Sequence, residues 1–271
     1  MTTVWARIVI LLVLTISLGA LYIVPIYLET QSGENYLQVH FLAVGQGDAI
    51  LLETPDGVQV LVDSGRDRRV LAQLGQHMSP YDRTLDMVVM THPDSDHIGG
   101  MDEVFSRFAV DYLLTTEVEG SNLIMERIDE ALVAQASLVT YNARAGMEFQ
   151  LGASTTMSVL SPTYNPTAME RNASSIVLRV SYGDTAIMLT GDASVAVENY
   201  LVSRYGEELV SDILKLGHHG SDTSSGESFL ETVNADFAVI SAGSDNSYGH
   251  PDSEVLERML EQGMFPVSTQ M

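Results

Sequence analysis

The sequence predicts one large α/β domain that follows an apolar N-terminal segment. From about residue 37 onward, short apolar runs typical of buried strands alternate with segments of helical periodicity. The chain has 271 residues, 45% of them hydrophobic, which suits one such domain with an appendage. Several apolar runs end in loops that contain His, Asp and Gly. Because sites in α/β folds form in the loops beyond strand ends, we expect the function to lie there.

Composition restricts the chemistry that these loops can carry. The chain has no cysteine, so it contains no disulfide and no thiolate metal site. Any metal must be held by His and by oxygen ligands. The formal net charge is −23, and Lys215 is the only lysine. This acidic balance disfavours tight non-specific binding to nucleic acid, which depends on neutralised phosphates, although a bound metal supplies local positive charge.

The first 35 residues predict a membrane anchor and a linker. The stretch Ile8–Leu28 carries no charged residue and is long enough to cross a bilayer. Arg7 precedes it and Glu29 follows, so the positive-inside rule places the rest of the chain outside the cell. The competing interpretation is a signal peptide, whose cleavage would release a secreted form. We expect a single-pass cell-membrane protein with an extracytoplasmic domain at residues 36–271.

A predicted strand and a hairpin open the domain. Leu37–Val44 alternates as a strand, and the Gly-rich turn 45–48 follows it. Residues 49–54 and 58–62 form a predicted hairpin that ends at Asp63. Asp48, in the turn, is interpreted either as a turn residue or as a group that orients a ligand. We favour the orienting role for Asp63, because it ends an apolar strand.

The most informative stretch is Thr91–Gly100. It follows the apolar run Met87–Met90, which predicts a buried strand, and it precedes a helix-like segment from about Ile98 to Phe108. It contains four candidate metal ligands, namely His92, Asp94, Asp96 and His97. A loop here can point the first two one way and the last two another, which suits two adjacent metal ions. A capped turn alone would need only one or two such residues.

Further strands and helices alternate through the middle of the chain. We expect strands near residues 110–114, 138–141, 155–160 and 175–181, and a helix near 122–135.

The second half of the chain repeats the pattern of a buried strand followed by ligand-type side chains. Residues 185–190 predict a strand, and Asp192 follows at a position where a carboxylate can bridge two metals. Residues 213–216 predict another strand, followed by His218 and His219 between glycines. His250 comes after a third apolar run. Packing alone does not explain His residues placed repeatedly beyond strand ends.

These motifs resemble those of a known family. The pattern His92-x-Asp94-x-Asp96-His97 resembles the metallo-β-lactamase superfamily signature, whose usual form is His-x-His-x-Asp-His. From about residue 37 to 271, the motifs in order resemble the extracytoplasmic hydrolase domain of ComEC-type competence proteins. The resemblance implies a metallo-β-lactamase fold, an αββα four-layer sandwich with two metal ions at one edge of the paired sheets.

The resemblance also implies a set of metal ligands. One ion would be held by His92, Asp94 and Asp192, and the other by Asp96, His97, Asp192 and His218. His219 stays open as the alternative to His218. Asp94 stands where the family signature has His, and no third His occurs between His97 and His218. Harder oxygen ligands shift the preference from Zn²⁺ towards Mn²⁺, so the two ions are expected to be Mn²⁺ or Zn²⁺.

By the same resemblance, the chain is expected to be a metal-dependent phosphodiester hydrolase, a DNA nuclease that uses a metal-bound hydroxide. Four residues are candidates for proton transfer or phosphate stabilisation, namely Asp96, Lys215, His219 and His250. The alternative for Lys215 is a surface residue at a strand end. The alternative functions are hydrolysis of a smaller phosphoester or cell-envelope phosphodiester, and a non-catalytic accessory module of DNA uptake. Only one membrane span is expected in this chain, whereas ComEC proper has a polytopic channel. The sequence identifies no protein partner.

Overall fold

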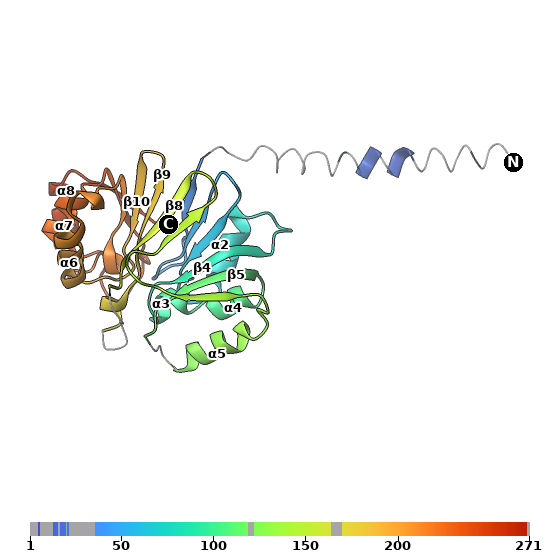
Figure 1. The fold of residues 1–271 in the computed structure, drawn as a ribbon, viewed down its shortest axis with the longest axis horizontal. Coiled ribbons are helices and arrows are strands. Elements are labelled where there is room, and N and C mark those ends of the chain that lie inside the picture. The colour runs from blue at the N-terminus through green and yellow to red at the C-terminus, as the bar shows by residue number, and fades with distance from the viewer. Residues whose placement is uncertain are drawn as a thin grey trace.

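The computed structural model describes residues 36–118, 122–163 and 170–269, together with positions 5, 13–15, 17–19 and 21. Two β-sheets pack face to face, and helices cover the outer face of each sheet (Figure 1). The α/β class is therefore confirmed. The four layers have the αββα order that the family resemblance implied.

The first sheet has six strands in the order β1-β2-β3-β4-β5-β6. Its strands are β1 (Gln38–Phe41), β2 (Ile50–Glu53), β3 (Gln59–Val62), β4 (Thr84–Met90), β5 (Ala109–Thr115) and β6 (Val139–Asn142). β1 to β3 are antiparallel, whereas β3 to β6 run parallel. Because β3 and β4 are parallel neighbours, Asp63 and the segment that begins at Thr91 leave the sheet at the same edge.

The second sheet has seven strands in the order β13-β12-β11-β10-β9-β8-β7. They are β7 (Glu148–Leu151), β8 (Thr155–Ser161), β9 (Val177–Tyr182), β10 (Thr185–Leu189), β11 (Ile213–Lys215), β12 (Phe237–Ile240) and β13 (Phe265–Ser268). β10 to β13 run parallel. The loops that carry Asp192 and the two adjacent histidines therefore leave neighbouring strands at one edge.

The helices divide between the two outer faces. The first sheet is covered by α2 (Arg69–His77), α3 (Ser95–Ile98), α4 (Met101–Phe105) and α5 (Asn122–Leu132), and the second by α6 (Val195–Tyr205), α7 (Glu227–Val233) and α8 (Ser253–Glu261). Three 3-10 turns are η2 (Asn172–Ser174), η3 (Gly206–Leu209) and η4 (Gly217–Gly220).

The helix expected from about Ile98 to Phe108 is instead two short helices, and the first begins at Ser95. Gly99 separates them, and a Cβ atom there would lie 2.1 Å from the carbonyl oxygen of Arg66. The close approach of this backbone to the loop after β3 breaks the helix. It also places Asp96 and His97 on a helical turn rather than in an open loop.

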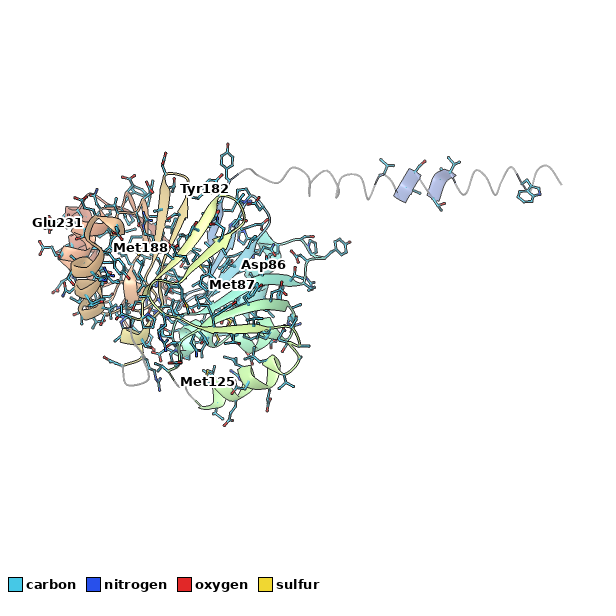
Figure 2. The ribbon with its side chains drawn as sticks, viewed as in Figure 1. Asp86, Met87, Met125, Tyr182, Met188 and Glu231 are labelled. Carbon is cyan, nitrogen blue, oxygen red and sulfur yellow. The ribbon has the colours of Figure 1, made fainter. Side chains whose placement is uncertain are left out.

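Alternation of side chains along the strands divides the core into three clusters. Val60 and Val62 of β3 face the second sheet, whereas Leu61 between them faces the helices. In the same way, Figure 2 shows Met87 between the sheets and Met188 on the side of helices α6 to α8. This period of two is what a strand buried on both faces requires. The core thus consists of three apolar clusters, and the loops that carry the candidate ligands lie at one edge of the sheets.

The predicted anchor at residues 8–28 lies largely outside the described residues. The described positions 13–15, 17–19 and 21 are helical. Within the portion of the chain that the structure describes, no helix combines the length and the apolar character that a membrane span needs. The anchor stays a prediction.

A buried carboxylate joins helix α6 to the loop that precedes α7. Glu198 is 1% exposed and accepts hydrogen bonds from the backbone N–H groups of Ser225, at 2.7 Å, and Gly226, at 2.8 Å. Arg258 donates to the carbonyl of Ser225 and adds a positive charge nearby. Burial nevertheless raises the pKa of Glu198 to about 7. The position therefore favours the neutral carboxyl group.

We expect Glu198 to make the stability of the domain depend on pH. A carboxyl group whose folded pKa is raised contributes stability that is complete below its ordinary pKa of 4.5 and is lost as pH rises through about 7. Between pH 5 and pH 8, in urea unfolding with EDTA, the wild type should lose on the order of 1–3 kcal/mol relative to Glu198→Gln. A stability difference that stays constant over this range would contradict the expectation.

Candidate metal centre

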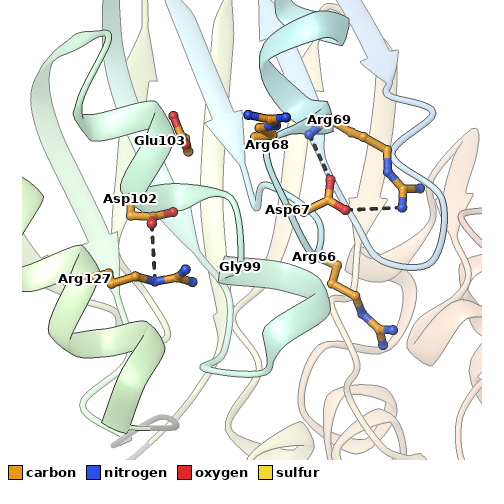
Figure 3. Close-up of a pocket in the computed structure, with 8 residues that line it drawn as sticks. All are labelled: Arg66, Asp67, Arg68, Arg69, Gly99, Asp102, Glu103 and Arg127. Carbon is orange, nitrogen blue, oxygen red and sulfur yellow. Dashed lines mark hydrogen bonds and ion pairs between the residues drawn. The ribbon is translucent and has the colours of Figure 1, made fainter.

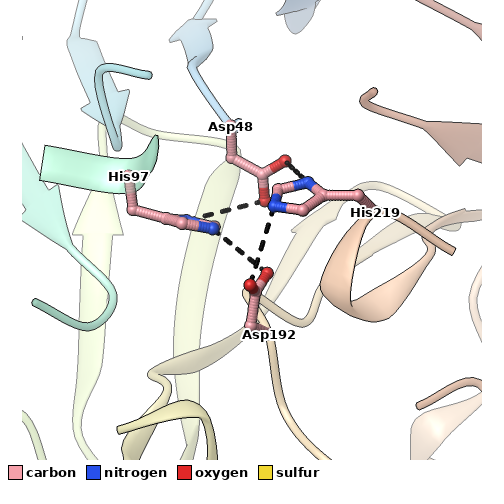
Figure 4. A group of neighbouring side chains, drawn as sticks. All are labelled: Asp48, His97, Asp192 and His219. Atoms are coloured by element: carbon pink, nitrogen blue, oxygen red, sulfur yellow. Dashed lines mark ion pairs between the residues drawn. The ribbon is translucent and has the colours of Figure 1, made fainter. Parts of the chain in front are cut away.

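Asp192 lies at the centre of a cluster of imidazoles. It follows β10 and is 3% exposed. The Nε2 atom of His97 lies 3.1 Å from its Oδ1, and the Nε2 atoms of His219, His92 and His218 lie 3.6, 3.7 and 3.7 Å from its Oδ2. Figure 4 shows His97 and His219 approaching this carboxylate from opposite sides. Four side chains from two segments, one after β4 and one after β11, therefore present the same nitrogen to one carboxylate.

The other ring nitrogen of each histidine is held by the protein. The Nδ1 partners are Thr91 Oγ1 for His92 at 3.1 Å, Asp63 Oδ2 for His97 at 2.7 Å, Thr223 Oγ1 for His218 at 2.9 Å and the Ser241 carbonyl for His219 at 2.8 Å. Metal-binding histidines have this arrangement, because a fixed partner at one nitrogen orients the ring and leaves the other nitrogen for the ion. The role of Asp63 in orienting a histidine is thus confirmed.

Several buried polar atoms of the cluster have no hydrogen-bond partner among the described residues. They are Asp48 Oδ1, His92 Nε2, His97 Nε2, Asp192 Oδ1 and His219 Nε2. Leaving a buried polar group unsatisfied costs about 1–3 kcal/mol, so five such atoms in one place require an explanation. Asp48, His97, Asp192 and His219 each offer a ligand atom within 4.8 Å of the others (Figure 4). A divalent cation held by these four side chains would satisfy their unpaired atoms, and the donor set fits one.

The backbone around the cluster adopts conformations that most residues avoid. His218 and His219 have φ angles of +47° and +57°, in the left-handed region. The turn directs both rings toward Asp192 from adjacent positions in sequence. In the loop after β1, a Cβ atom at Gly47 would lie 2.0 Å from the Asp96 carbonyl oxygen, so only glycine fits. This close approach places Asp48, the next residue, against the segment that carries Asp96.

Charges within the cluster are strongly coupled. Burial disfavours a charge on Asp192, but the neighbouring His97 and His219 hold its pKa well below the ordinary value. Burial also disfavours the cation of His97, yet the carboxylates of Asp192 and Asp63 raise the pKa of His97 well above the ordinary value. Burial, helped by the positive charge of His97, lowers the pKa of His92 to about 3. His92 is therefore neutral at physiological pH, the state in which an imidazole binds a metal.

Asp48 and Lys215 form a fully buried ion pair beside the cluster. The ammonium group of Lys215 contacts Asp48 Oδ2 and donates to the Gly191 carbonyl at 3.3 Å. Although burial opposes its ionisation, Asp48 has its pKa lowered to about 2, mainly by Lys215. The alternative that Lys215 is a surface residue is wrong. Sequence reasoning missed Asp48 as a member of the cluster, and its one signal was the Gly-rich turn before it.

The two remaining predicted ligands lie at the rim of the cluster. Asp94 Oδ2 is 3.9 Å from His92 Nε2, and its Oδ1 pairs with Arg171 at 3.1 Å. Asp96 Oδ2 is 3.5 Å from His219 Nε2. Burial opposes the charge of Asp96, but the proximity of His219 and His97 lowers its pKa. The structure thus gathers the other five predicted ligands around Asp192, and the role of all six as ligands stays a prediction.

His250 lies next to the cluster rather than within it. Its ring centroid is 5.8 Å from that of His218, and its Nδ1 is 3.5 Å from Asp252 Oδ2. His40 and His77 contact each other elsewhere, with ring centroids 4.1 Å apart. Of the predicted catalytic residues, Asp96 and His219 lie in the cluster, Lys215 lies buried against it and His250 lies at its edge.

Comparison with known proteins agrees with this geometry. The sequence profile of the metallo-beta-lactamase superfamily matches residues 42–120, which include Asp48, Asp63 and the four ligand-type residues after β4. This chain contains a metallo-beta-lactamase domain. The domain belongs to a superfamily of metal-dependent hydrolases, and its buried Asp and His cluster is suited to divalent metal ions.

Two curated relatives are similar over most of the metallo-beta-lactamase domain. Competence protein ComA of Neisseria gonorrhoeae is 30% identical over 232 residues, which cover 85% of this chain and 30% of that protein. ComE operon protein 3 of Bacillus subtilis is 29% identical over 240 residues, which cover 81% of this chain and 30% of that protein. The chain therefore spans about 30% of the length of these relatives.

A solved structure supports the fold. The metallo hydrolase Igni18 of the archaeon Ignicoccus hospitalis superposes with a TM-score of 0.53 at 14% sequence identity. The superposition covers 86% of this chain and 94% of that chain. At this identity, the likeness shows only that the two proteins share a fold.

We expect Asp192→Asn to abolish stabilisation of the protein by metal. Mn²⁺ or Zn²⁺ at about 100 times its Kd should stabilise the wild type by about 2.7 kcal/mol, seen as a rise in Tm. The variant lacks the carboxylate that faces all four imidazoles, so its Tm should not respond. Asp184→Asn, an exposed residue just before the opposite end of β10, should respond as the wild type does. A metal-dependent Tm in Asp192→Asn would exclude this residue as a ligand.

A second pair of variants separates the two adjacent histidines. Asn tolerates the left-handed backbone, so His218→Asn and His219→Asn remove one imidazole each without added strain. His219 is 1% exposed and its Nε2 atom lacks a partner, whereas the side chain of His218 is 28% exposed. Metal titration should therefore show a larger loss of affinity for His219→Asn, on the order of 100-fold or more. The opposite ranking would favour His218 as the ligand.

Proposed function

We propose that this chain is a metal-dependent phosphodiesterase that cleaves DNA. The observation that carries the proposal is the convergence of four imidazole Nε2 atoms on the buried carboxylate of Asp192. Three of these nitrogens, in His92, His97 and His219, are buried without a hydrogen-bond partner among the described residues, and a metal site would use them. The superfamily match and the two similar competence proteins support a hydrolytic metal site.

The arrangement fits two ions on either side of one shared carboxylate. His92 and Asp94 would hold the first ion with Asp192. Asp96 and His97 would hold the second with Asp192, completed by one of the adjacent histidines. The mixture of carboxylate oxygen and imidazole nitrogen is compatible with Mn²⁺ as well as Zn²⁺.

Ions held here would supply an activated water and withdraw charge from a phosphoryl oxygen. The chain's own residues then have distinct tasks. Asp192 bridges the two halves of the site, and Lys215 holds Asp48 and lies 4.0 Å from Asp192 Oδ1. His250 is 12% exposed in its side chain, so it can meet a substrate and protonate the leaving oxygen. Asp96, at the other rim, can accept a proton.

One observation favours a second candidate, a smaller phosphoester or a cell-envelope phosphodiester. The chain carries 36 acidic and 13 basic residues, which repels a long polyanion. A small substrate would meet only the metal centre and residues close to it. A catalytically inactive accessory role is less favoured, because the ligand-type residues are all in place.

The setting of the proposed activity follows from the N-terminal sequence. We place the hydrolase outside the cell membrane, anchored through residues 8–28, or released if that segment is cleaved. The relatives are named for competence and for a com operon, which supports a role beside DNA uptake.

The test compares three substrates and several metals. The soluble part, from about residue 34, is incubated with single-stranded DNA, double-stranded DNA or bis(p-nitrophenyl) phosphate. Each reaction contains Mn²⁺, Zn²⁺, Mg²⁺ or EDTA. We expect metal-dependent cleavage of DNA that EDTA abolishes and that Asp192→Ala reduces by at least about 10³-fold, as loss of a central catalytic group does.

The control variant is Asp184→Ala, which should cleave as the wild type does. Hydrolysis of the small diester without cleavage of DNA would move the assignment to a small or envelope phosphodiester. Failure of all substrates with every metal, in protein shown to bind metal, would favour the accessory role.

A further inference from the structure

A polar cavity lies beside the metal centre and has no task in the chemistry described above. Its volume is about 410 Å³, and it is bounded by the loops that follow β1, β3 and β12. Its lining includes Gln46, Arg66, Arg69, Asp245, Asn246 and Tyr248. A cavity of this size lies within the range of small-ligand sites.

A continuous series of aromatic contacts joins this cavity to the metal centre. The ring of His218, which faces Asp192, lies 5.8 Å from the ring of His250. The ring of His250 in turn lies 5.9 Å from that of Tyr248, and the two rings are nearly parallel at 9°. Arg66 Nη2 lies 3.4 Å from the Tyr248 hydroxyl, to which it donates. A substrate on the metals would therefore extend directly over Tyr248 and Arg66.

The loop that carries Tyr248 is held in place from within. The side-chain amide of Asn246 donates to the carbonyls of Gly243 and His250, both at 2.7 Å. Its side-chain oxygen accepts from the backbone N–H groups of Tyr248 and His250. Tyr248 is nevertheless 58% exposed, so its ring is available to a ligand.

Arg66 differs from Arg69 on the loop after β3. Arg69 pairs with Asp67 and donates to the Val44 carbonyl, whereas no carboxylate in the described part of the chain lies within ion-pair distance of Arg66. Figure 3 shows the Asp67–Arg69 and Asp102–Arg127 pairs, with Arg66 taking part in neither. In so acidic a chain, an arginine without a carboxylate partner beside the active site favours an anionic ligand.

We propose that this cavity binds the nucleotide next to the scissile phosphodiester of single-stranded DNA. The base stacks on Tyr248, and the neighbouring phosphate pairs with Arg66. Stacking on an aromatic side chain requires an unpaired base, so the subsite selects single strands over duplex. The carboxylate of Asp245, which also lines the cavity, opposes a second phosphate there. The inference rests on the proposed function, because it assigns the substrate class of the same site.

The experiment measures binding and cleavage separately in the full chain. Fluorescence anisotropy with a labelled single-stranded oligonucleotide in EDTA gives Kd without turnover. With metal, kcat/KM is measured for the oligonucleotide and for bis(p-nitrophenyl) phosphate, which is too small to span both sites. Arg66→Ala and Tyr248→Ala should each weaken oligonucleotide binding about tenfold. Their loss of kcat/KM should be about tenfold greater on the oligonucleotide than on the small diester.

Matched controls separate the subsite from general effects of charge and of aromatic surface. Arg68→Ala removes an equally exposed positive charge two residues from Arg66, and Tyr81→Ala removes an exposed ring elsewhere. Both should bind and cleave as the wild type does. Tyr248→Phe keeps the ring and should retain most of the affinity.

The outcomes distinguish this inference from the proposed function. If wild type cleaves DNA but Arg66→Ala and Tyr248→Ala match their controls, the subsite is excluded and the hydrolase assignment stands. Equal losses on both substrates would also exclude it, because the residues would then act through the metal centre. If wild type cleaves neither substrate, the hydrolase assignment fails. The binding measurement then still decides the subsite, and absence of binding by the wild type would overturn it.

Discussion

The buried carboxylate of Asp192 is the constraint on which the site depends. Moving such a charge out of water costs several kcal/mol unless opposite charge surrounds it. The ammonium of Lys215 lies 4.0 Å away but is already paired with Asp48, and burial keeps His92 neutral. Without metal, protonated His97 and His219 supply the compensating charge, because nearby carboxylates raise the pKa of both. A metal ion and these protons therefore compete for the same nitrogen atoms beside Asp192. Neutral His92 keeps the lone pair of its Nε2 atom directed at that carboxylate.

The two sheets supply what the loops alone could not. Parallel neighbours β3 and β4 end at the same edge, and so do β10, β11 and β12 of the facing sheet. Side chains more than 100 residues apart in sequence, such as His97 and His219, thereby meet within 5.2 Å of one another, measured between ring centroids. Asp63 and Ser241 then fix the two rings from behind. The rigid core therefore sets the geometry of the site.

Sequence periodicity predicted the strands and the loops that follow them, because a buried strand and a polar loop differ sharply in local composition. The order of the sheets came from a family resemblance rather than from periodicity. Local patterns could not show that Lys215 is buried, since its nearest carboxylate partner, Asp48, lies in a distant turn. Nor could they show that Gly99 breaks a helix by packing against the Arg66 backbone. Both facts depend on contacts between segments far apart in sequence.

The acidic surface and the proposed polyanionic substrate are compatible for a physical reason. Repulsion between exposed charges is screened within about 8 Å at physiological ionic strength, whereas divalent ions held in the buried site would act at contact distance. Net charge would therefore govern how often a DNA strand approaches, and the bound ions would govern whether it binds. In a chain with so few basic residues, an arginine that is not neutralised by a neighbouring carboxylate contributes most to binding an anionic substrate. Arg66 lies beside Tyr248 and forms no ion pair with a described carboxylate, so it meets that condition next to the site where charge would be needed.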